Sequence, residues 1–486
     1  MNEKISIKRN FMMNIILTIS SFIFPLISFP YVSRVLQPEG IGKVNLANSL
    51  VSYFLIVAQL GIPTYGIRAT AQVRDDTKKL SKVSQELLTI NLVMCAIAYI
   101  LLIATVLITP KFSSEKILYF ISSATLFFDA IGMEWLYKGL EQYSYITKRS
   151  VLFKFIALVL MFALVKTKSD YVIYCAITIF ATSASYVLNF IHARKYISFK
   201  PVRHLELRKH LKSVGVFFAM TCAVTAYVNL DTLMLGIMKT DAEVGYYSTG
   251  VKIRTILLSV AVSLGTVLLP RTSYYYKNGQ IKEFSRINKK ALNFTILLAS
   301  SLAVYFIQMA ADTVYVISGP AYTRSILPLQ VILPTVLIAG ISNVTGLEIL
   351  IPEGREKIVL YSEITGAVVD LVINSILIPP LGGVGAAIGT LAAEIAVLGV
   401  QVFSDPKQFH ELFSGLSYVK IILADIFATL SILWIHAWNV VPFVRLLVSC
   451  IVFFCIYGLS LYLLKEPLFR ELFDEVIGKL RKAKHD

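Results

Sequence analysis

Charged side chains inside apolar runs are the first residues in this sequence that could do chemistry. The run AYVNLDTLMLG, residues 226–236, is interrupted by Asp231, and the next apolar run contains Lys252 and Arg254. An ionisable side chain at the centre of a membrane helix costs about 2.5–3.5 kcal/mol on insertion scales, so such residues tend to face a partner or a water-filled cavity. These three residues are therefore candidates for binding a charged ligand.

A second set of polar side chains recurs at a spacing of four residues. Asp370 and Asn374 share one helix face, and Thr390 and Glu394 share another, because residues four apart lie one turn apart. Carboxylate, amide and hydroxyl oxygens are the ligands that hard cations prefer. Two interpretations stay open for these residues together with Asp231. They form a site for a coupling cation or proton, or a buried polar network that the basic residues of the preceding run neutralise.

Membrane-spanning helices are the elements that would position these residues. The chain has 486 residues, of which 56% are hydrophobic and only 16% are charged, whereas soluble chains are about 25% charged. Its mean hydropathy is +0.70. Apolar stretches of roughly 20 residues recur from end to end, and each is long enough to cross a hydrocarbon core of ~30 Å. The runs are continuous rather than alternating, so the sequence predicts an all-α polytopic membrane protein and not a β-barrel.

The loops between the spans give the orientation. About 14 transmembrane helices are predicted, at 10–34, 44–64, 86–109, 117–137, 150–165, 170–193, 213–237, 244–270, 291–311, 325–346, 358–378, 383–403, 419–437 and 441–464. With both termini cytosolic, 34 of the 46 lysine and arginine residues fall on the inner side and 8 on the outer side, which is the bias expected of cytoplasmic loops. The net charge of +16 then reflects topology, and no nucleic-acid partner is expected.

A repeat divides the chain into two similar halves. PEGIGKVNLANSL, residues 38–50, aligns without gaps on DAEVGYYSTGVKI, residues 241–253, and places Gly42 on Gly245. The alternative is chance similarity between two turns that enter helices. Transporters are often built from such repeats, with the substrate site between them. We therefore expect two six-helix lobes around a central cavity and two further C-terminal helices. The expected segments are an N-lobe at 1–205, a C-lobe at 206–406, the last two helices at 407–465 and a cytosolic amphipathic tail at 466–486.

Five segments together resemble one family. They are FPYVSRVLQPEGIGKVNLANSLVSYF, LGIPTYGIRATAQVRDD, EWLYKGLEQYSYITKRS, NLDTLMLGIMKTDAEVGYYSTGVKI and PPLGGVGAAIGTLAAE. In type and order they are similar to the polysaccharide (Wzx-type) flippases of the multidrug/oligosaccharidyl-lipid/polysaccharide exporter superfamily. The resemblance runs from about residue 8 to residue 400. Gln37 departs from it, because the family has glycine at that turn.

The resemblance implies a function that composition alone does not give. It implies a flippase of the bacterial cytoplasmic membrane that moves an undecaprenyl-pyrophosphate-linked oligosaccharide from the inner to the outer leaflet by alternating access. Membrane lipids, and the polysaccharide polymerase machinery, are the other partners it suggests. No cofactor is expected. In the related lipid II flippases a sodium site is built on helices seven, eleven and twelve, so Na⁺ or H⁺ is the candidate coupling ion. The matching residues are Asp231, Asp370, Asn374, Thr390 and Glu394.

The implied pyrophosphate requires cationic partners. Arginine offers it a bidentate fork, and lysine a point charge. The candidates are Arg254, Lys252, Arg34 and Arg68. Arg254 lies deepest in its predicted span, whereas Arg34 and Arg68 lie near span ends, where basic residues also serve topology alone.

Three other functions remain open from the sequence. The first is a flippase of lipid II itself, and the second is a multidrug or cation antiporter of the same superfamily, although Lys252 and Arg254 favour an anionic ligand. The third is a membrane-embedded polymerase or ligase. Such an enzyme is disfavoured, because no nucleophile–base pair or metal-ligand spacing is present and the longest predicted outer loop, at 311–324, carries one arginine.

Overall fold

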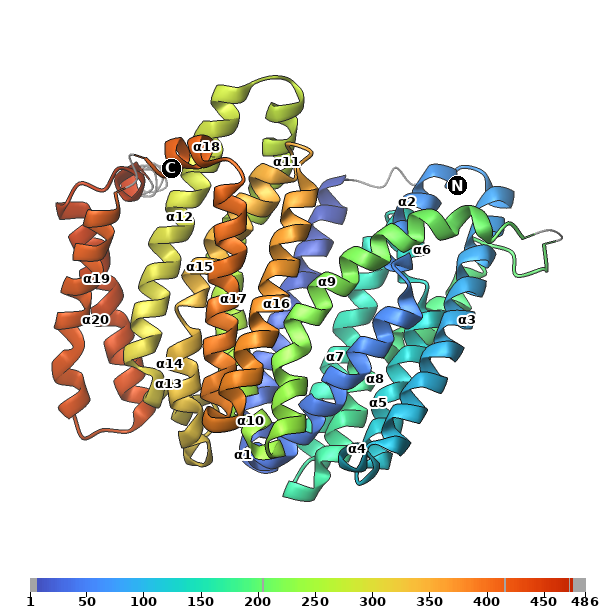
Figure 1. Ribbon diagram of the computed structural model, residues 1–486, viewed down its shortest axis with the longest axis horizontal. Coiled ribbons are helices and arrows are strands. Elements are labelled where there is room, and N and C mark those ends of the chain that lie inside the picture. Colours follow the sequence, from blue (N-terminus) through green and yellow to red (C-terminus); the bar gives the residue numbers. More distant parts are fainter. Residues whose placement is uncertain (1–6, 203–204, 415–416, 472, 475–486) are drawn as a thin grey trace, which may run out of the picture. The chain divides into compact units, whose positions relative to one another are not determined.

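The protein is helical throughout the part that a computed structural model describes, residues 7–202, 205–414, 417–471 and 473–474 (Figure 1). Among these residues no β-strand occurs, which confirms the predicted all-α class. The chain divides into two compact units, Met1–Gly245 and Tyr246–Asp486. The predicted lobe boundary at 205/206 stays a prediction.

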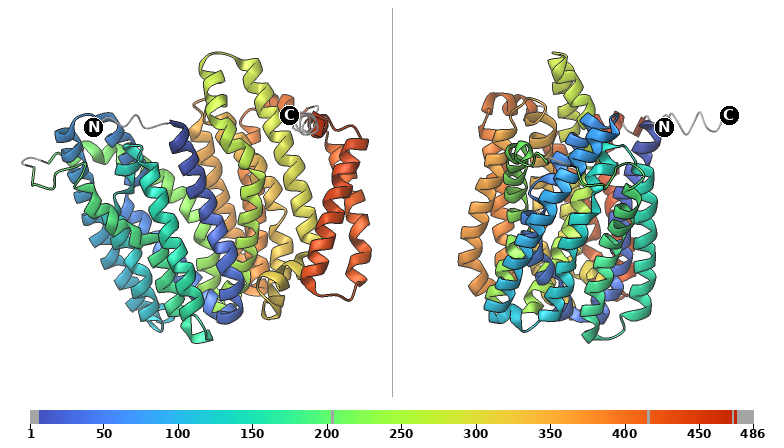
Figure 2. Two further views of the ribbon diagram at one scale, coloured as in Figure 1. Left: turned by 180° about the vertical axis from the view of Figure 1, so that it is seen from behind. Right: turned by 90° about the vertical axis from the view of Figure 1, so that its right-hand side faces the viewer.

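The first unit is a bundle of long helices. In Figures 1 and 2 the helices α3, α5, α7 and α8 run beside one another, and α5 packs against both α3 and α8. The elements are α1 (Ile7–Gln59), α2 (Ile62–Val73), α3 (Thr77–Ile108), α4 (Pro110–Ser113), α5 (Lys116–Gly132), α6 (Glu134–Gly139), α7 (Tyr143–Leu164), η1 (Lys168–Asp170), α8 (Tyr171–Ala193) and α9 (Arg208–Met238). Helix α10 (Asp241–Ala261) begins in this unit and continues in the second.

Helix α1 is broken into two arms at Gln37. The backbone there has φ 60° and ψ 174°, a combination that is almost confined to glycine. The side chain partly compensates, because Gln37 Nε2 donates a hydrogen bond of 2.6 Å to the carbonyl oxygen of Arg34. At this turn glutamine therefore adopts, under strain, a backbone conformation that favours glycine.

The second unit contains a pair of apolar helical segments that meet at a bend. Its elements after α10 are α11 (Ser263–Lys277), α12 (Ile281–Gln308), α13 (Ala310–Ile317), η2 (Pro320–Ser325), α14 (Ile326–Ile332), α15 (Thr335–Asn343), η3 (Val344–Leu350), α16 (Glu356–Leu381), α17 (Gly383–Phe403), α18 (Pro406–Phe413), α19 (Tyr418–Ile432), η4 (Leu433–Ala437) and α20 (Pro442–Leu463). The axis turns by 46° between Pro320–Ile332 and Thr335–Leu350. The η3 segment that follows α15 is a π-helix.

Helical segments occur at each of the fourteen predicted spans. By length and hydropathy, nine helices of the described residues could cross a membrane, or ten if the bent pair is one span. The count of 14 therefore stays a prediction, while a multi-pass membrane protein is confirmed. Helices α3 and α12 begin at Thr77 and Ile281, about ten residues before the predicted spans, because their first turns are polar and hydropathy marks only the apolar part of a helix.

One expected loop is helical. The sequence predicts an open outer loop at 311–324, but most of this segment belongs to α13 and η2. Asp312 is buried there and forms an ion pair of 2.5 Å with Arg445 of α20. Tyr322 is fully buried as well. The hydropathy pattern does not reveal this element because its polar residues have partners that lie far away in the sequence.

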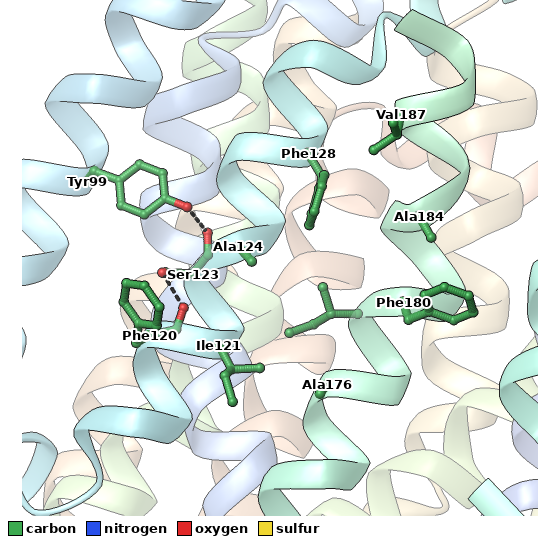
Figure 3. A pocket seen from close by; sticks show the side chains of 11 residues that line it. Tyr99, Phe120, Ile121, Ser123, Ala124, Phe128, Ala176, Phe180, Ala184 and Val187 are labelled. Atoms are coloured by element: carbon green, nitrogen blue, oxygen red, sulfur yellow. Dashed lines mark hydrogen bonds between the residues drawn. The ribbon is translucent and has the colours of Figure 1, made fainter. Parts of the chain in front are cut away.

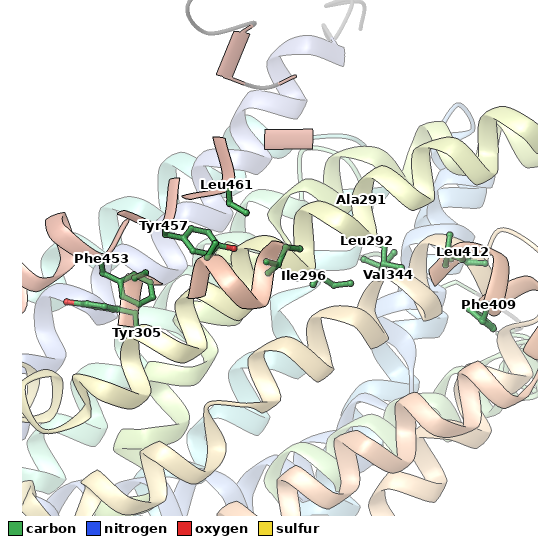
Figure 4. Packing of buried hydrophobic residues seen from close by; sticks show 14 of the residues in the cluster. Ala291, Leu292, Ile296, Tyr305, Val344, Phe409, Leu412, Phe453, Tyr457 and Leu461 are labelled. Atoms are coloured by element: carbon green, nitrogen blue, oxygen red, sulfur yellow. The ribbon is translucent and has the colours of Figure 1, made fainter. Parts of the chain in front are cut away.

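The last two helices share one apolar core with α12. Figure 4 shows Phe453 and Tyr457 of α20 against Tyr305 and Ile296 of α12. The hydroxyl of Tyr457 donates a hydrogen bond of 2.8 Å to the carbonyl oxygen of Leu297, so the aromatic body is buried and its polar tip is satisfied. The described part of the predicted tail at 466–486 is limited to 466–471 and 473–474, and the remainder of that prediction lies outside the described residues.

Candidate functional site

The predicted polar faces of α16 and α17 lie against each other. Asp370 and Asn374 are fully buried on α16, and Thr390 and Glu394 are buried on α17. A Cβ at Gly389 would lie 2.1 Å from Asn374 Oδ1 and 3.0 Å from Asp370 Oδ1. Only a glycine lets α17 approach these side chains so closely. The spacing of four residues in each helix therefore marks buried, facing positions, as expected from the sequence.

Arg254 links three helices of the second unit. Its Nη2 lies 2.5 Å from Oε1 of Glu394 on α17, and its Nε donates a hydrogen bond of 2.8 Å to Oγ1 of Thr335 on α15. The Thr335 hydroxyl in turn donates to the carbonyl oxygen of Ile332. The side chains of Arg254 and Glu394 are only 15% and 8% exposed. The guanidinium is thus held at the bend between α14 and α15.

Tyr247 adds a polar contact that was not predicted from the sequence. Thr390 Oγ1 donates to the carbonyl oxygen of Ala386, so the Tyr247 hydroxyl, 2.9 Å away, donates its proton to Thr390. Tyr247 precedes Arg254 by two helical turns and shares its face of α10. The seven-residue spacing between Tyr247 and Arg254 is the sequence signal that could have revealed Tyr247. Together the two residues connect α10 to α17 at Thr390 and at Glu394.

Lys252 does not share the face of Arg254. Both residues lie on α10, but residues two apart on a helix point to different sides. Lys252 is half-buried. Its predicted role beside Arg254 in binding an anion stays a prediction.

The remaining predicted site residues belong to the first unit. Arg34 is exposed, and its Nη1 donates a hydrogen bond of 3.2 Å to the carbonyl oxygen of Pro30. Arg68 is exposed on α2, whereas Asp231 is buried on α9. The α9 backbone two residues before Asp231 is held against α1, since Ser49 Oγ donates a hydrogen bond of 2.9 Å to the carbonyl oxygen of Asn229. The predicted set of five oxygen-bearing residues is thus divided between the two units, and its joint role stays a prediction.

A buried carboxylate cluster at the start of α9 was also not predicted. Glu86 of α3 is fully buried. Its Oε1 accepts a hydrogen bond of 2.8 Å from the backbone N–H of Glu206, and its Oε2 lies 2.8 Å from His210 Nε2. His210 Nδ1 lies 2.8 Å from the Tyr65 hydroxyl. Burial works to lower the pKa of Lys209, but its hydrogen bond and charge attraction to Glu86 outweigh this and leave that pKa raised. The cluster ties α9 to α2 and α3.

Two cavities of the first unit differ in chemistry. One, of about 410 Å³, lies among α3, α5 and α8 and is almost entirely apolar (Figure 3). Its only hydroxyls, on Tyr99 and Ser123, both donate to backbone carbonyl oxygens. The other, of about 270 Å³, is polar and includes Lys43, Lys111 and Asp241. Lys111 forms an ion pair of 2.9 Å with Asp241 there.

No group of three or more His, Cys, Asp or Glu side chains within the described residues has a geometry that could hold a metal ion. The ligand chemistry that these residues offer is therefore that of buried cations, carboxylates and hydroxyls. In the part of the second unit that the structure describes, the arrangement around Arg254 presents a guanidinium, a carboxylate and two hydroxyls from several helices at once.

Comparison with solved structures identifies the fold. The chain matches the inward closed conformation of the lipid II flippase MurJ with a TM-score of 0.70 at 15% identity, over 95% of this chain and 100% of that one. It also matches an inward-facing multidrug resistance MATE family transporter of the MOP superfamily, with a TM-score of 0.64 at 14% identity over 82% and 96% of the two chains. The fold is therefore that of these two solved structures.

Comparison with known sequences identifies the family. A protein of Escherichia coli K12 named "Putative O-antigen transporter" is 23% identical over 82% of this chain and 97% of its own length. One of the same name from Shigella dysenteriae is 23% identical over 80% and 98%. Both names are those of transporters, which agrees with the expectation that the chain is not an enzyme. The sequence model of the family described as "Polysaccharide biosynthesis protein" matches residues 7–275, more than half of the chain. The chain therefore belongs to the polysaccharide biosynthesis protein family.

Proposed function

We propose that this protein is a flippase that carries an undecaprenyl-pyrophosphate-linked oligosaccharide from the inner to the outer leaflet of the bacterial cytoplasmic membrane, with both termini cytosolic. The observation that carries the proposal is the match to two proteins named as O-antigen transporters over 97% and 98% of their lengths. Transport by alternating access is part of the proposal, and the fold shared with solved structures titled as inward closed and inward-facing supports it.

Arg254 is the residue we assign to the pyrophosphate. A guanidinium binds phosphate oxygens in a bidentate fashion, and it does so most strongly where water is scarce. In this conformation Glu394 is paired with that guanidinium. We propose that an incoming pyrophosphate displaces Glu394, which makes binding an exchange of one anion for another. Lys252, Arg34 and Arg68 are proposed as further cationic contacts along the path of the substrate.

The exchange suggests how an ion could be coupled to transport. A Glu394 carboxylate released from Arg254 stays buried on α17, one turn from Thr390 and in the helix that packs against α16. A carboxylate in such surroundings requires a counter-charge. We propose that Na⁺ or H⁺ supplies it. Asp231, buried on α9 of the first unit, stays a separate candidate for binding the coupling ion.

The class of substrate can be tested by ligand-induced stabilisation of the purified full-length protein in nanodiscs. A ligand at 100 times its Kd raises the free energy of unfolding by about 2.7 kcal/mol. We expect an undecaprenyl-pyrophosphate-linked oligosaccharide to raise the melting temperature. We expect lipid II to do so less, and a lipophilic cation not at all. Stabilisation by the cation alone would favour the multidrug antiporter and contradict the proposal.

A further inference from the structure

The π-helical turn η3 buries a carboxylate that the proposed site does not use. In this turn the N–H of Ile351 donates a hydrogen bond of 3.0 Å to the carbonyl oxygen of Gly346, five residues back. Such turns insert one extra residue into a helix and are frequent at functional sites. Glu348 lies within this turn and is only 1% exposed.

Glu348 has no partner that would stabilise its charge. Among the described residues, neither Oε1 nor Oε2 has a hydrogen-bond partner. The flanking residues Val344, Ile349 and Leu350 belong to the apolar core shared with α12 and α20 (Figure 4). An isolated ionised carboxylate in apolar surroundings is so costly that the group becomes neutral instead. This environment therefore accommodates the carboxylic acid rather than the carboxylate.

The elements packed against η3 are α11, α12, α15, α16 and α17. Their charged residues are Arg271, Lys277, Lys282, Glu283, Arg286, Lys289, Lys290, Glu356, Lys357, Glu363, Asp370 and Glu394. None of these forms a hydrogen bond or an ion pair with Glu348. Arg254, another basic residue of this unit with a mostly buried side chain, is paired with Glu394 instead.

The surroundings also distinguish a proton from a metal cation. Hard cations require several oxygen ligands to replace their water. Within the described ranges, Glu348 is not part of any group of three or more His, Cys, Asp or Glu side chains that could hold a metal ion. A proton needs only the carboxyl oxygen itself.

We propose that Glu348 is a proton-binding site, loaded in this conformation and emptied when the π-helical turn opens to water. The turn is connected to the helix of the candidate site, because Thr345 Oγ1 donates a hydrogen bond of 2.5 Å to Oε1 of Gln401 on α17. Gln401 Nε2 in turn donates 3.2 Å to Ser362 Oγ on α16. A change in charge at Glu348 would therefore be felt by the two helices that carry Asp370 and Glu394. The site goes beyond the proposed function and does not depend on which lipid is carried.

Infrared difference spectroscopy on the purified full-length protein tests this site without any transport substrate. The wild type at neutral pH should show the C=O stretch of a protonated carboxyl, with the isotope shift expected in D₂O. Glu348→Gln should lose one component of that band in the difference between variant and wild type, whereas Glu411→Gln should lose none, because Glu411 is exposed. Glutamine has nearly the size and shape of the protonated acid, so the fold should be retained.

A second measurement covers a variant that fails to fold. The melting temperature of the wild type should fall relative to that of Glu348→Met as the pH rises, because folding then requires uptake of a proton. A pH-independent difference in melting temperature, or a carboxylic acid band of equal intensity in the wild type and Glu348→Gln, would overturn the proposal. Either outcome leaves the lipid specificity untouched, so failure of this site and failure of the proposed function are distinguishable.

Discussion

Replacement of Gly42 by alanine is expected to destabilise the protein severely, because the added methyl group has no room. A Cβ at this position would lie 1.6 Å from the carbonyl oxygen of Asp241 and 2.9 Å from the backbone nitrogen of Gly245. The colliding atoms are backbone, so no side-chain rotation relieves the contact. Overpacking of a tight core costs typically about 1–3 kcal/mol, and more where backbone must move. We expect a loss of about 3 kcal/mol, measured as lower melting temperature and yield.

The control for this variant is Gly215→Ala on α9. A Cβ at Gly215 meets no atom within 4 Å, and alanine is favoured over glycine in a helix by about 1 kcal/mol. Its melting temperature should stay constant or rise. Equal melting temperatures for Gly42→Ala and Gly215→Ala would show that the helices at Gly42 are not closely packed.

The same contact bears on the internal repeat. The alignment that places Gly42 on Gly245 also places Pro38 on Asp241. Gly42 packs against Asp241, and a Cβ at Gly245 would lie 1.9 Å from the carbonyl oxygen of Pro38. In the alignment, the contact between Gly42 and Asp241 therefore corresponds to the contact between Gly245 and Pro38. A pair of related turns would produce such reciprocal packing, so the contact supports the repeat, which stays a prediction. Gly245→Ala should reproduce the effect of Gly42→Ala.

Replacement of Arg254 by methionine is expected to affect stability and transport separately. The variant leaves Glu394 buried without its cation, and breaking a buried ion pair in this way costs about 3–5 kcal/mol. It also removes the hydrogen bond to Thr335. We expect a clear fall in melting temperature at neutral pH. Arg286→Met is the control, because the Arg286 side chain is 75% exposed and pairs only with a neighbour on its own helix.

The double variant Arg254→Met, Glu394→Gln separates the two effects. Removal of both charges should restore most of the stability, because no buried charge is left unpaired. Lipid translocation should stay lost, because the cation assigned to the pyrophosphate is still absent. Recovery of translocation together with stability would show that Arg254 has a structural role only.

The spacing of polar residues along the helices predicted which helix faces are buried. It did not predict which side chains of different helices pair with one another. Asp370, Asn374, Thr390 and Glu394 were found by their four-residue intervals, and all four are buried on the facing helices α16 and α17. Thr335 could not be found in this way, because a single hydroxyl in an apolar run has no periodic signal. Its role comes from a guanidinium 81 residues away in the sequence.

Polar residues at the ends and breaks of helices were the least predictable features. The strained turn at Gln37 was suspected only because a family has glycine there, and its φ of 60° gives the reason. The π-helical turn that buries Glu348 has no hydropathy signal, since one charge among apolar residues looks the same in an α-helix. The sequence did not reveal the buried Glu86, because its partners His210 and Lys209 lie on another helix, far away along the chain.

The central claim, that this chain translocates a lipid-linked oligosaccharide, is tested most directly in proteoliposomes that contain the purified protein. An undecaprenyl-pyrophosphate-linked oligosaccharide labelled on its glycan is placed in both leaflets, and a membrane-impermeant reagent reads the exposed fraction over time. We expect the protected pool to become accessible with the wild type and with Arg286→Met, and to stay protected with Arg254→Met, Glu394→Gln. A pool that stays protected with folded wild-type protein, while lipid II or a lipophilic cation is moved, would contradict the account.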